Sequence, residues 1–77
     1  MKSKMTINRY GSREWRNEEG LLYRTDGPAI IYSNGDKAWY ENGQCHRTDG
    51  PAVIRSSGFQ AWYQNGELIK EEKKTLW

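Results

Sequence analysis

The chain has 77 residues, of which 35% are hydrophobic and 29% charged, and its formal net charge is +2. A chain of this size folds as one small domain with a limited core, and so small a net charge does not require a polyanionic partner. The single cysteine, Cys45, excludes an internal disulfide framework and is typical of a reducing compartment. No stretch is apolar enough for a membrane-spanning helix. We therefore expect a cytoplasmic protein that does not insert into membranes.

Residues 1–12 form a polar and basic segment. Together with the next four residues they carry a charge of +4, from five cations and one carboxylate: Lys2, Lys4, Arg9, Arg13, Arg16 and Glu14. The segment lacks the hydrophobic region of a signal peptide. We interpret it as a basic arm or as the first edge of a sheet, and the sequence leaves open whether it contacts nucleic acid.

Glycines occur at regular intervals along the rest of the chain. Seven of the eight glycines follow one another every seven or eight residues, at positions 20, 27, 35, 43, 50, 58 and 66. Residues 20–47 and 43–70, compared at an offset of 23, are identical at 15 of 28 positions, including the run Arg-Thr-Asp-Gly-Pro-Ala. A period of this length indicates one supersecondary unit copied along the chain.

Short segments with strand preferences alternate with these glycines. They predict strands at Arg13–Arg16, Leu21–Arg24, Ala29–Tyr32, Lys37–Tyr40, Gln44–Arg47, Ala52–Arg55, Phe59–Tyr63 and Glu67–Ile69. The predicted fold class is therefore all-β, an antiparallel meander of about 7–8 short strands in an elongated, twisted sheet.

Three kinds of turn separate the predicted strands. Asn42-Gly43 and Asn65-Gly66 predict two-residue hairpins of type I′, because Asn and Gly tolerate the positive φ that this turn needs at both positions. Ser-Asn-Gly-Asp and Ser-Ser-Gly predict a second kind. Thr-Asp-Gly-Pro predicts a third, in which Gly supplies a special backbone angle and Pro opens the next strand. The loop from Asn17 to Gly20 holds one extra residue, which predicts a longer first hairpin loop.

The repeats define the expected domain organisation. Residues 13–69 are the predicted hairpin-repeat domain, and residues 70–77 are a charged tail or a short capping helix. An open sheet exposes unpaired backbone groups at its first and last strands. Polar termini could cap these edges, or the edges could pair with a second copy, so a homodimer remains open.

The spacing of the repeated residues resembles the MORN repeat, whose units are β-hairpins. The matching positions are Trp39, Asn42, Gly43, His46, Gly50, Gly58 and Trp62. The His-Arg-Thr-Asp-Gly-Pro-Ala run resembles more closely a variant found in bacteriophage, bacterial and large-virus proteins. This resemblance covers about residues 13 to 69 and implies a scaffolding or recognition role. If the source is viral, the compartment is the host cytoplasm. The position of His46 is Tyr23 in the first copy and Ile69 in the last, so this His is not shared among the copies.

Alternation along the strands separates two aromatic faces. Trp39 and Trp62 are predicted on one face, and Tyr40 and Tyr63 on the other. We expect the Trp face to be the core, with Ile30 and Val53 beside the rings, and the Tyr face to be the recognition surface, because a single-layer sheet cannot bury both. Candidate contact residues are Tyr23, Arg24, Tyr32, Tyr40, His46, Arg47, Arg55, Phe59 and Tyr63.

These residues favour a non-enzymatic protein-binding module, plausibly a phage-type accessory protein that binds and modulates a host protein, for example as an inhibitor. An alternative is binding of RNA, single-stranded DNA or a nucleotide through the Arg and Tyr rows, and a further alternative is a structural homo-oligomer. We predict no enzymatic activity, cofactor or metal. Cys45 and His46 are adjacent on a strand and point to opposite faces, so they cannot form a nucleophile and base pair.

Overall fold

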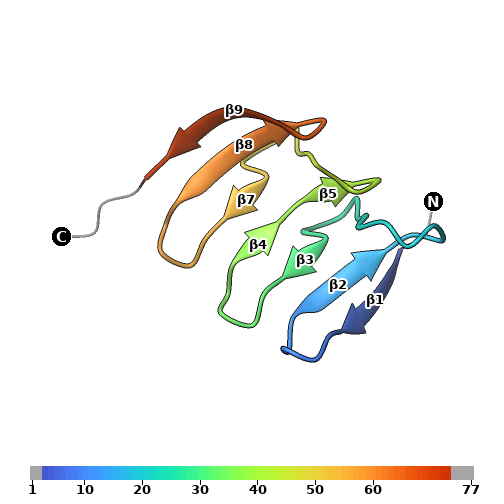
Figure 1. Ribbon diagram of the computed structural model, residues 1–77. Coiled ribbons are helices and arrows are strands. Elements are labelled where there is room, and N and C mark those ends of the chain that lie inside the picture. The colour runs from blue at the N-terminus through green and yellow to red at the C-terminus, as the bar shows by residue number, and fades with distance from the viewer. Residues whose placement is uncertain (1–2, 74–77) are drawn as a thin grey trace.

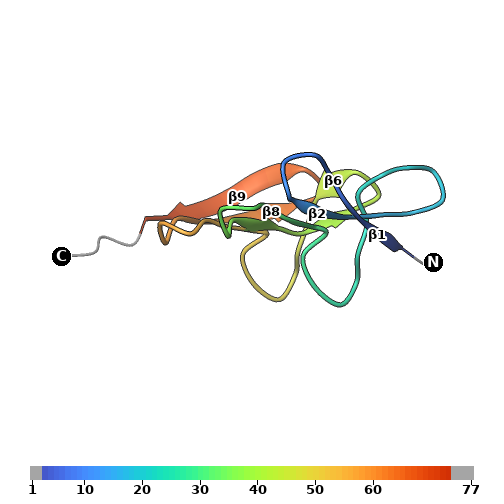
Figure 2. The same ribbon diagram turned by 90° about the horizontal axis from the view of Figure 1, so that it is seen from below.

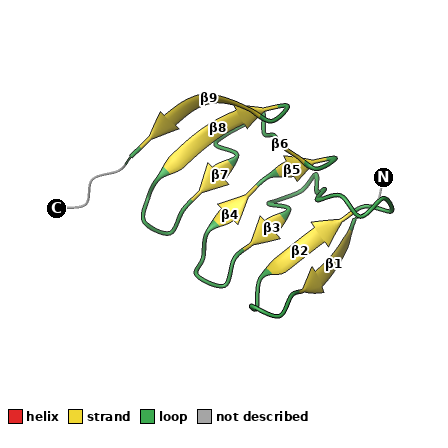
Figure 3. Ribbon diagram, in the orientation of Figure 1, coloured by secondary structure: helices red, strands yellow, loops and turns green. Residues whose placement is uncertain are grey.

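The computed structural model describes residues 3–73, which form an open antiparallel sheet without helices (Figures 1 and 3). Seven strands lie in the order β1-β2-β3-β4-β7-β8-β9, and β5 and β6 form a separate two-stranded sheet. The strands are β1 (Lys4–Ile7), β2 (Arg13–Arg16), β3 (Ile30–Ile31), β4 (Lys37–Ala38), β5 (Tyr40–Glu41), β6 (Gln44–Cys45), β7 (Val53–Ile54), β8 (Gln60–Gln64) and β9 (Glu67–Glu72). The predicted all-β antiparallel meander is confirmed. Residues 3–73 contain no helix long and apolar enough to cross a membrane.

The N-terminal segment takes one of its two expected roles, whereas the C-terminal segment differs from the expectation. β1 lies within the basic N-terminal segment and pairs with β2, so this segment supplies the first edge of the sheet. At the other end, β9 continues through Glu72. The segment expected as a tail or a capping helix therefore begins as a strand, and residues 74–77 lie outside the described residues.

The predicted hairpin turns are confirmed by their backbone angles. Asn42 and Gly43 have φ of 51° and 82°, and Asn65 and Gly66 have φ of 52° and 82°, so both pairs adopt the positive angles of a type I′ turn. The turns that contain Gly11, Gly20, Gly35 and Gly58 form another class, in which the glycine N–H donates to a carbonyl three residues earlier and the glycine φ is positive. The long first loop, Asn17–Gly20, belongs to this class.

The Thr-Asp-Gly-Pro segments are loops, but the chain does not reverse its direction in them. The Trp39 N–H donates to the Ala52 carbonyl at 2.7 Å, and the Trp39 carbonyl accepts from the His46 N–H at 3.0 Å. β6 and β7 are therefore two parts of one interrupted strand, both antiparallel to the strand that contains Trp39. Residues 47–51, the Arg47 loop, leave the sheet between these two parts. The first-copy loop, the Arg24 loop of residues 24–28, leaves the sheet opposite Trp15 in the same way. Figure 2 shows both loops, teal and olive, on one side of a single-layered sheet.

The most buried apolar residues are four alanines and one isoleucine, which lie on both faces of the sheet. Ala29 and Ala52 are fully buried, and Ile30, Ala38 and Ala61 are nearly so, while no large side chain in residues 3–73 is fully buried. Small residues in neighbouring strands allow the backbone to pack closely where no second layer exists.

The strand register corrects the expected core. Ile30 pairs with Ala38, which pairs with Val53, and Val53 pairs with Ala61. Residues paired directly across antiparallel strands share a face, so Ile30 and Val53 lie on the face of Ala38 and Ala61. This is the face of Tyr40 and Tyr63, here called the tyrosine face. The prediction that Ile30 and Val53 accompany the Trp rings was wrong because it did not fix the register. Trp15, Trp39 and Trp62 lie on the opposite face, here called the tryptophan face.

Candidate functional site

Each tryptophan of the repeats is covered by a cation supplied by its own repeat. The offset of 23 residues that relates Arg24 to Arg47 also leads to Lys70, and all three side chains lie over an indole ring. A cation over an indole face is attracted by the negative centre of the ring. The three pairs, measured to the ring centroid, are Arg24 on Trp15 at 3.9 Å, Arg47 on Trp39 at 4.0 Å and Lys70 on Trp62 at 4.9 Å.

The loops hold the arginines in place on the side away from the ring. Arg47 Nε donates to Asp49 Oδ1 at 2.9 Å, and its Nη1 donates to the Pro51 carbonyl at 3.0 Å. A Cβ on Gly50 would lie 2.9 Å from the guanidinium carbon, closer than such atoms approach. The guanidinium is therefore held between the Trp39 ring and a glycine that makes room for it.

The Arg24 loop repeats these contacts. Arg24 Nε donates to Asp26 Oδ1 at 2.9 Å, its Nη1 donates to the Pro28 carbonyl at 3.2 Å, and a Cβ on Gly27 would lie 3.0 Å from the guanidinium carbon. The glycine of the loop has a different role from the one predicted. Neither Gly27 nor Gly50 has a positive φ, and a side chain at either position would crowd the guanidinium that lies against it, more closely at Gly50 than at Gly27.

Arg24 and Arg47 make their polar contacts within their own loops. Hydrogen bonding to Arg24 and then its charge lower the pKa of Asp26, and Arg47 lowers the pKa of Asp49 through the same two causes. The guanidinium groups are therefore already matched by carboxylates and carbonyls of their own loops. They are poorly placed to bind an external phosphate, which the nucleic-acid alternative required of them.

An open groove of about 510 Å³ lies between the two loops on the tryptophan face. His46 lies in it: its Nδ1 accepts from the Asn65 N–H at 3.0 Å, and its Nε2 lies 3.4 Å from Glu41 Oε2. This pattern makes His46 a link between two hairpin turns. The groove is lined by Arg24, Thr25, Asp26, Gly27, Trp39, Glu41, His46, Arg47, Thr48 and Asp49.

The tyrosine face carries an aromatic group without such a covering loop. Burial raises the pKa of Tyr40, and the nearby ionisable groups of Cys45, Tyr32 and Tyr63 raise it further. The register places all three tyrosines on this face, because Tyr32, Tyr40 and Tyr63 each follow by two residues the paired Ile30, Ala38 and Ala61. Tyr32 is 43% exposed. Burial raises the pKa of the Cys45 thiol to about 11, which keeps it protonated and unreactive near neutral pH.

Ion pairs lie on the tyrosine face beside these aromatic side chains. Arg55 Nη1 donates to Asp36 Oδ2 at 3.3 Å, and the Arg55 guanidinium carbon lies 6.0 Å from the centre of the Phe59 ring. Asp36 is buried, and its Oδ1 accepts from the Ser56 N–H at 2.7 Å. This backbone hydrogen bond is the main cause that lowers the Asp36 pKa.

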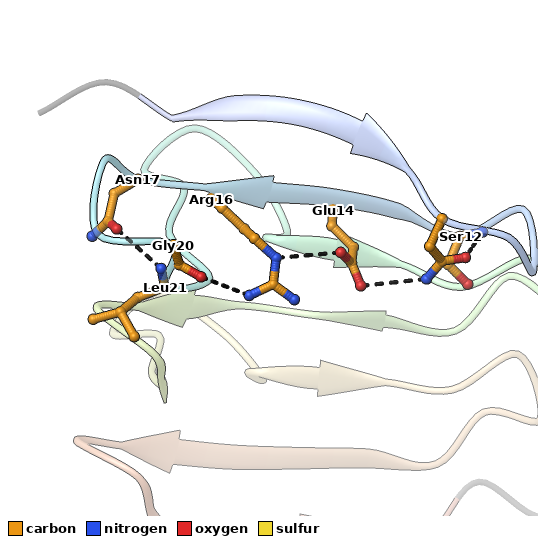
Figure 4. A network of polar contacts seen from close by, with 7 residues as sticks. Ser12, Glu14, Arg16, Asn17, Gly20 and Leu21 are labelled. Carbon is orange, nitrogen blue, oxygen red and sulfur yellow. Dashed lines mark hydrogen bonds and ion pairs between the residues drawn. The ribbon is translucent and has the colours of Figure 1, made fainter.

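A second polar network lies over the first hairpin (Figure 4). Asn8 Nδ2 donates to Glu14 Oε2 at 3.3 Å, Arg16 Nε donates to Glu14 Oε1 at 3.3 Å, and Arg16 Nη1 donates to the Gly20 carbonyl at 2.7 Å. Glu14 pairs with Ile30 and therefore belongs to the tyrosine face. The network runs along β2 from the β1–β2 turn to the Asn17–Gly20 loop, and it pairs the charge of Glu14 with that of Arg16.

The nine predicted contact residues do not form one surface. Those on the tryptophan face are Tyr23, Arg24, His46 and Arg47, and those on the tyrosine face are Tyr32, Tyr40, Arg55, Phe59 and Tyr63. The candidate contact residues did not include Glu14, Arg16 and Asp36, which order the border of the tyrosine face. The difference between Asp36 and Phe59 marks position 36 as a possible specificity position, but neither the repeats nor the strand pattern indicates the partners of these side chains.

Acid should destabilise the fold through its paired carboxylates. Asp26, Asp36 and Asp49 have folded-state pKa values below the ordinary 3.8, so their contribution is present above the unfolded-state value and is lost as the pH falls through the folded-state values. Urea unfolding monitored by Trp fluorescence should show a falling midpoint below about pH 4. The double variant Asp26→Asn and Asp49→Asn should show a shallower fall, and an unchanged slope would contradict the assignment.

Comparison with known proteins gives no match to a family model, to a curated protein or to a solved structure.

Proposed function

We propose that this chain is a non-enzymatic protein-binding module and that its tyrosine face is the contact surface. The observation that carries the proposal is an aromatic group whose neighbouring charges are already paired within the chain. The resemblance to MORN-like repeats supports a recognition role. It also suggests a phage-type accessory protein that binds and modulates a host protein.

The chemistry of the tyrosine face suits a protein partner. This face carries Tyr32, Tyr40 and Tyr63, whose large rigid rings can be buried at a small entropic cost. Arg55 with Asp36 and Arg16 with Glu14 form ion pairs on the same face. Protein interfaces have this anatomy, with aromatic side chains in a core that contains few charges and a polar rim around it.

Arginines that are already paired within the chain disfavour a nucleic-acid or nucleotide partner. Arg24 and Arg47 stack on indole rings and bind the carboxylates of their own loops, and Arg55 binds Asp36. The groove between the loops adds the carboxylate of Glu41 to those of Asp26 and Asp49. Nucleic-acid binding needs cations free to replace the counterions of phosphates.

Site-specific photo-crosslinking in the native cell tests which face binds. A photoreactive amino acid at position 32 on the tyrosine face should capture one defined protein. The same group at Lys37, which is exposed and pairs with Ile31 and Ile54 on the tryptophan face, should not capture it. Capture only from position 37, or of nucleic acid from position 32, would overturn the proposal.

With the captured protein purified, Tyr32→Ala combined with Tyr63→Ala should weaken binding at least tenfold. Aromatic side chains at the centre of an interface each contribute on the order of 1 to 2 kcal/mol or more. Isothermal titration calorimetry measures the loss. Tyr10→Ala is the matched control, because Tyr10 is 73% exposed in the β1–β2 turn, outside the aromatic group. Equal affinity of the double variant and wild type would reject the tyrosine face as the binding surface.

A further inference from the structure

The earlier repeats bind their successors through backbone positions that have counterparts on the last strand. The Arg47 N–H donates to the Tyr63 carbonyl at 3.1 Å, and the Cys45 carbonyl accepts from the Gly66 N–H at 2.9 Å. Arg24 and Leu22 make the corresponding bonds one repeat earlier, to Tyr40 at 3.3 Å and from Gly43 at 2.9 Å. Each repeat therefore presents one donor and one acceptor to its successor.

The offset of 23 residues carries these positions onto β9. The donor position becomes the Lys70 N–H, and the acceptor position becomes the Leu68 carbonyl. β9 is the last strand of the sheet, all six of its residues are exposed, and no strand of residues 3–73 lies beyond it. Its bulge falls opposite Trp62, where the earlier repeats place their loops opposite Trp15 and Trp39, so the irregularity belongs to the repeat pattern.

The strand that matches β9 best lies at the opposite edge of the same sheet. All residues of β1 are exposed, and among residues 3–73 it pairs with β2 alone. Its one charged residue is Lys4, whereas β9 carries three glutamates and one lysine. Both edges also expose apolar side chains: Met5 and Ile7 on β1, and Leu68 and Ile69 on β9.

We propose that copies of this chain associate head to tail, with β1 of one copy adding to β9 of the next. An antiparallel register that sets Lys4 opposite Glu72 also sets Thr6 opposite Lys70 and, across the bulge, Ile7 beside Leu68. This is the register in which β8 already pairs with the inner side of β9, where Gln60 lies opposite Glu72 and Trp62 opposite Lys70.

Pairing of like edges is less favourable on charge. Two antiparallel copies of β9 in full register set Glu67 opposite Glu72, and like charges directly opposite one another are destabilising. A contact between two different edges does not close on itself, so it adds copies progressively. The association uses the sheet edges and leaves the tyrosine face available, so it is independent of the proposed function.

Sedimentation velocity at low ionic strength tests this proposal. The weight-average sedimentation coefficient of the wild-type chain should rise with protein concentration. It should fall when added salt screens the charges. Lys4→Glu and Glu72→Lys should each be monomeric. The combined variant Lys4→Glu with Glu72→Lys restores opposite charges in the proposed register, so it should associate again.

Lys37→Glu is the matched control, because it reverses an exposed charge on the central strand β4, away from both edges, and should associate as wild type does. Circular dichroism verifies that every variant keeps its strand content. A wild-type chain that stays monomeric at all concentrations overturns the proposal. Association that survives Lys4→Glu would show that β1 is not the contact, and a double variant that fails to associate would reject the register; either result also overturns the proposal.

Discussion

Gly50→Ala should destabilise the protein by about 1 to 3 kcal/mol, the usual cost of adding a methyl group where there is no room for it. The new Cβ would lie 2.9 Å from the Arg47 guanidinium carbon. The guanidinium would have to leave the Trp39 ring or abandon its bonds to Asp49 and the Pro51 carbonyl. For a chain of this length, whose total stability is on the order of 4 to 12 kcal/mol, this is a large fraction. Urea unfolding monitored by Trp fluorescence measures it.

Removal of the arginine supplies the control. In an Arg47→Ala background the space beside residue 50 is empty, and the backbone of Gly50 is outside the left-handed region. Alanine should then be neutral or stabilising by about 0.4 to 1 kcal/mol, because it restricts the unfolded chain. The double-mutant cycle should therefore give a large coupling between positions 47 and 50. Equal costs in both backgrounds would show that the glycine is required for another reason.

The turns of this protein could be predicted from the sequence because their chemistry is local. Asn42-Gly43 and Asn65-Gly66 adopt positive φ at both positions, which few other residue pairs tolerate. The bounds of the strand Arg13–Arg16 could be predicted for a similar reason, since it lies between the turn at Gly11 and the Asn17–Gly20 loop. The antiparallel meander follows from such turns placed at regular intervals.

The Thr-Asp-Gly-Pro loops could not be predicted in this way. Gly27 and Gly50 contribute to the regular glycine spacing, which suggested another chain reversal. Their function depends on a contact with Arg24 or Arg47, side chains three residues earlier that fold back over the loop. The backbone of Trp39 bonds to both Ala52 and His46, which lie on either side of the Arg47 loop. These bonds decide that the chain continues in the same direction after the loop instead of reversing. These partners are set by the register of whole strands.

The sequence predicts the residue types of the candidate site and the face of its tyrosines, but not the partners of its charged side chains. Alternation along the strand placed Tyr40 and Tyr63 on the face opposite Trp39, as the register shows. The arginines could not be divided between structural and external roles, because this depends on the partner of each guanidinium. Asp36 belongs to a pair that forms across 19 residues of sequence and occurs in one repeat only. Comparison of the repeats shows that position 36 differs from position 59, but not which side chain Asp36 binds.

Trp39→Ala should have the largest effect of any change considered for this chain, a loss of about 3 kcal/mol in the free energy of unfolding. Trp39 follows β4 and precedes β5 in the chain, and the Arg47 guanidinium stacks on its indole ring at 4.0 Å. Its removal deprives the guanidinium of its cation–π contact and leaves the Arg47 loop without its support on the sheet. Thermal unfolding followed by circular dichroism measures the loss.

Trp62→Ala is the comparison that tests this explanation. Trp62 occupies the equivalent place in the next repeat, but its cation is Lys70 at 4.9 Å, on a strand that carries no Thr-Asp-Gly-Pro loop. A lysine ammonium lacks the planar fork that lets an arginine stack on a ring and bind a carboxylate at the same time. The Trp62 variant should therefore lose less stability than the Trp39 variant, because no loop depends on that ring. An equal or larger loss at Trp62 would show that the rings act through burial alone, and that the arginine, loop and glycine contribute little to holding the sheet together.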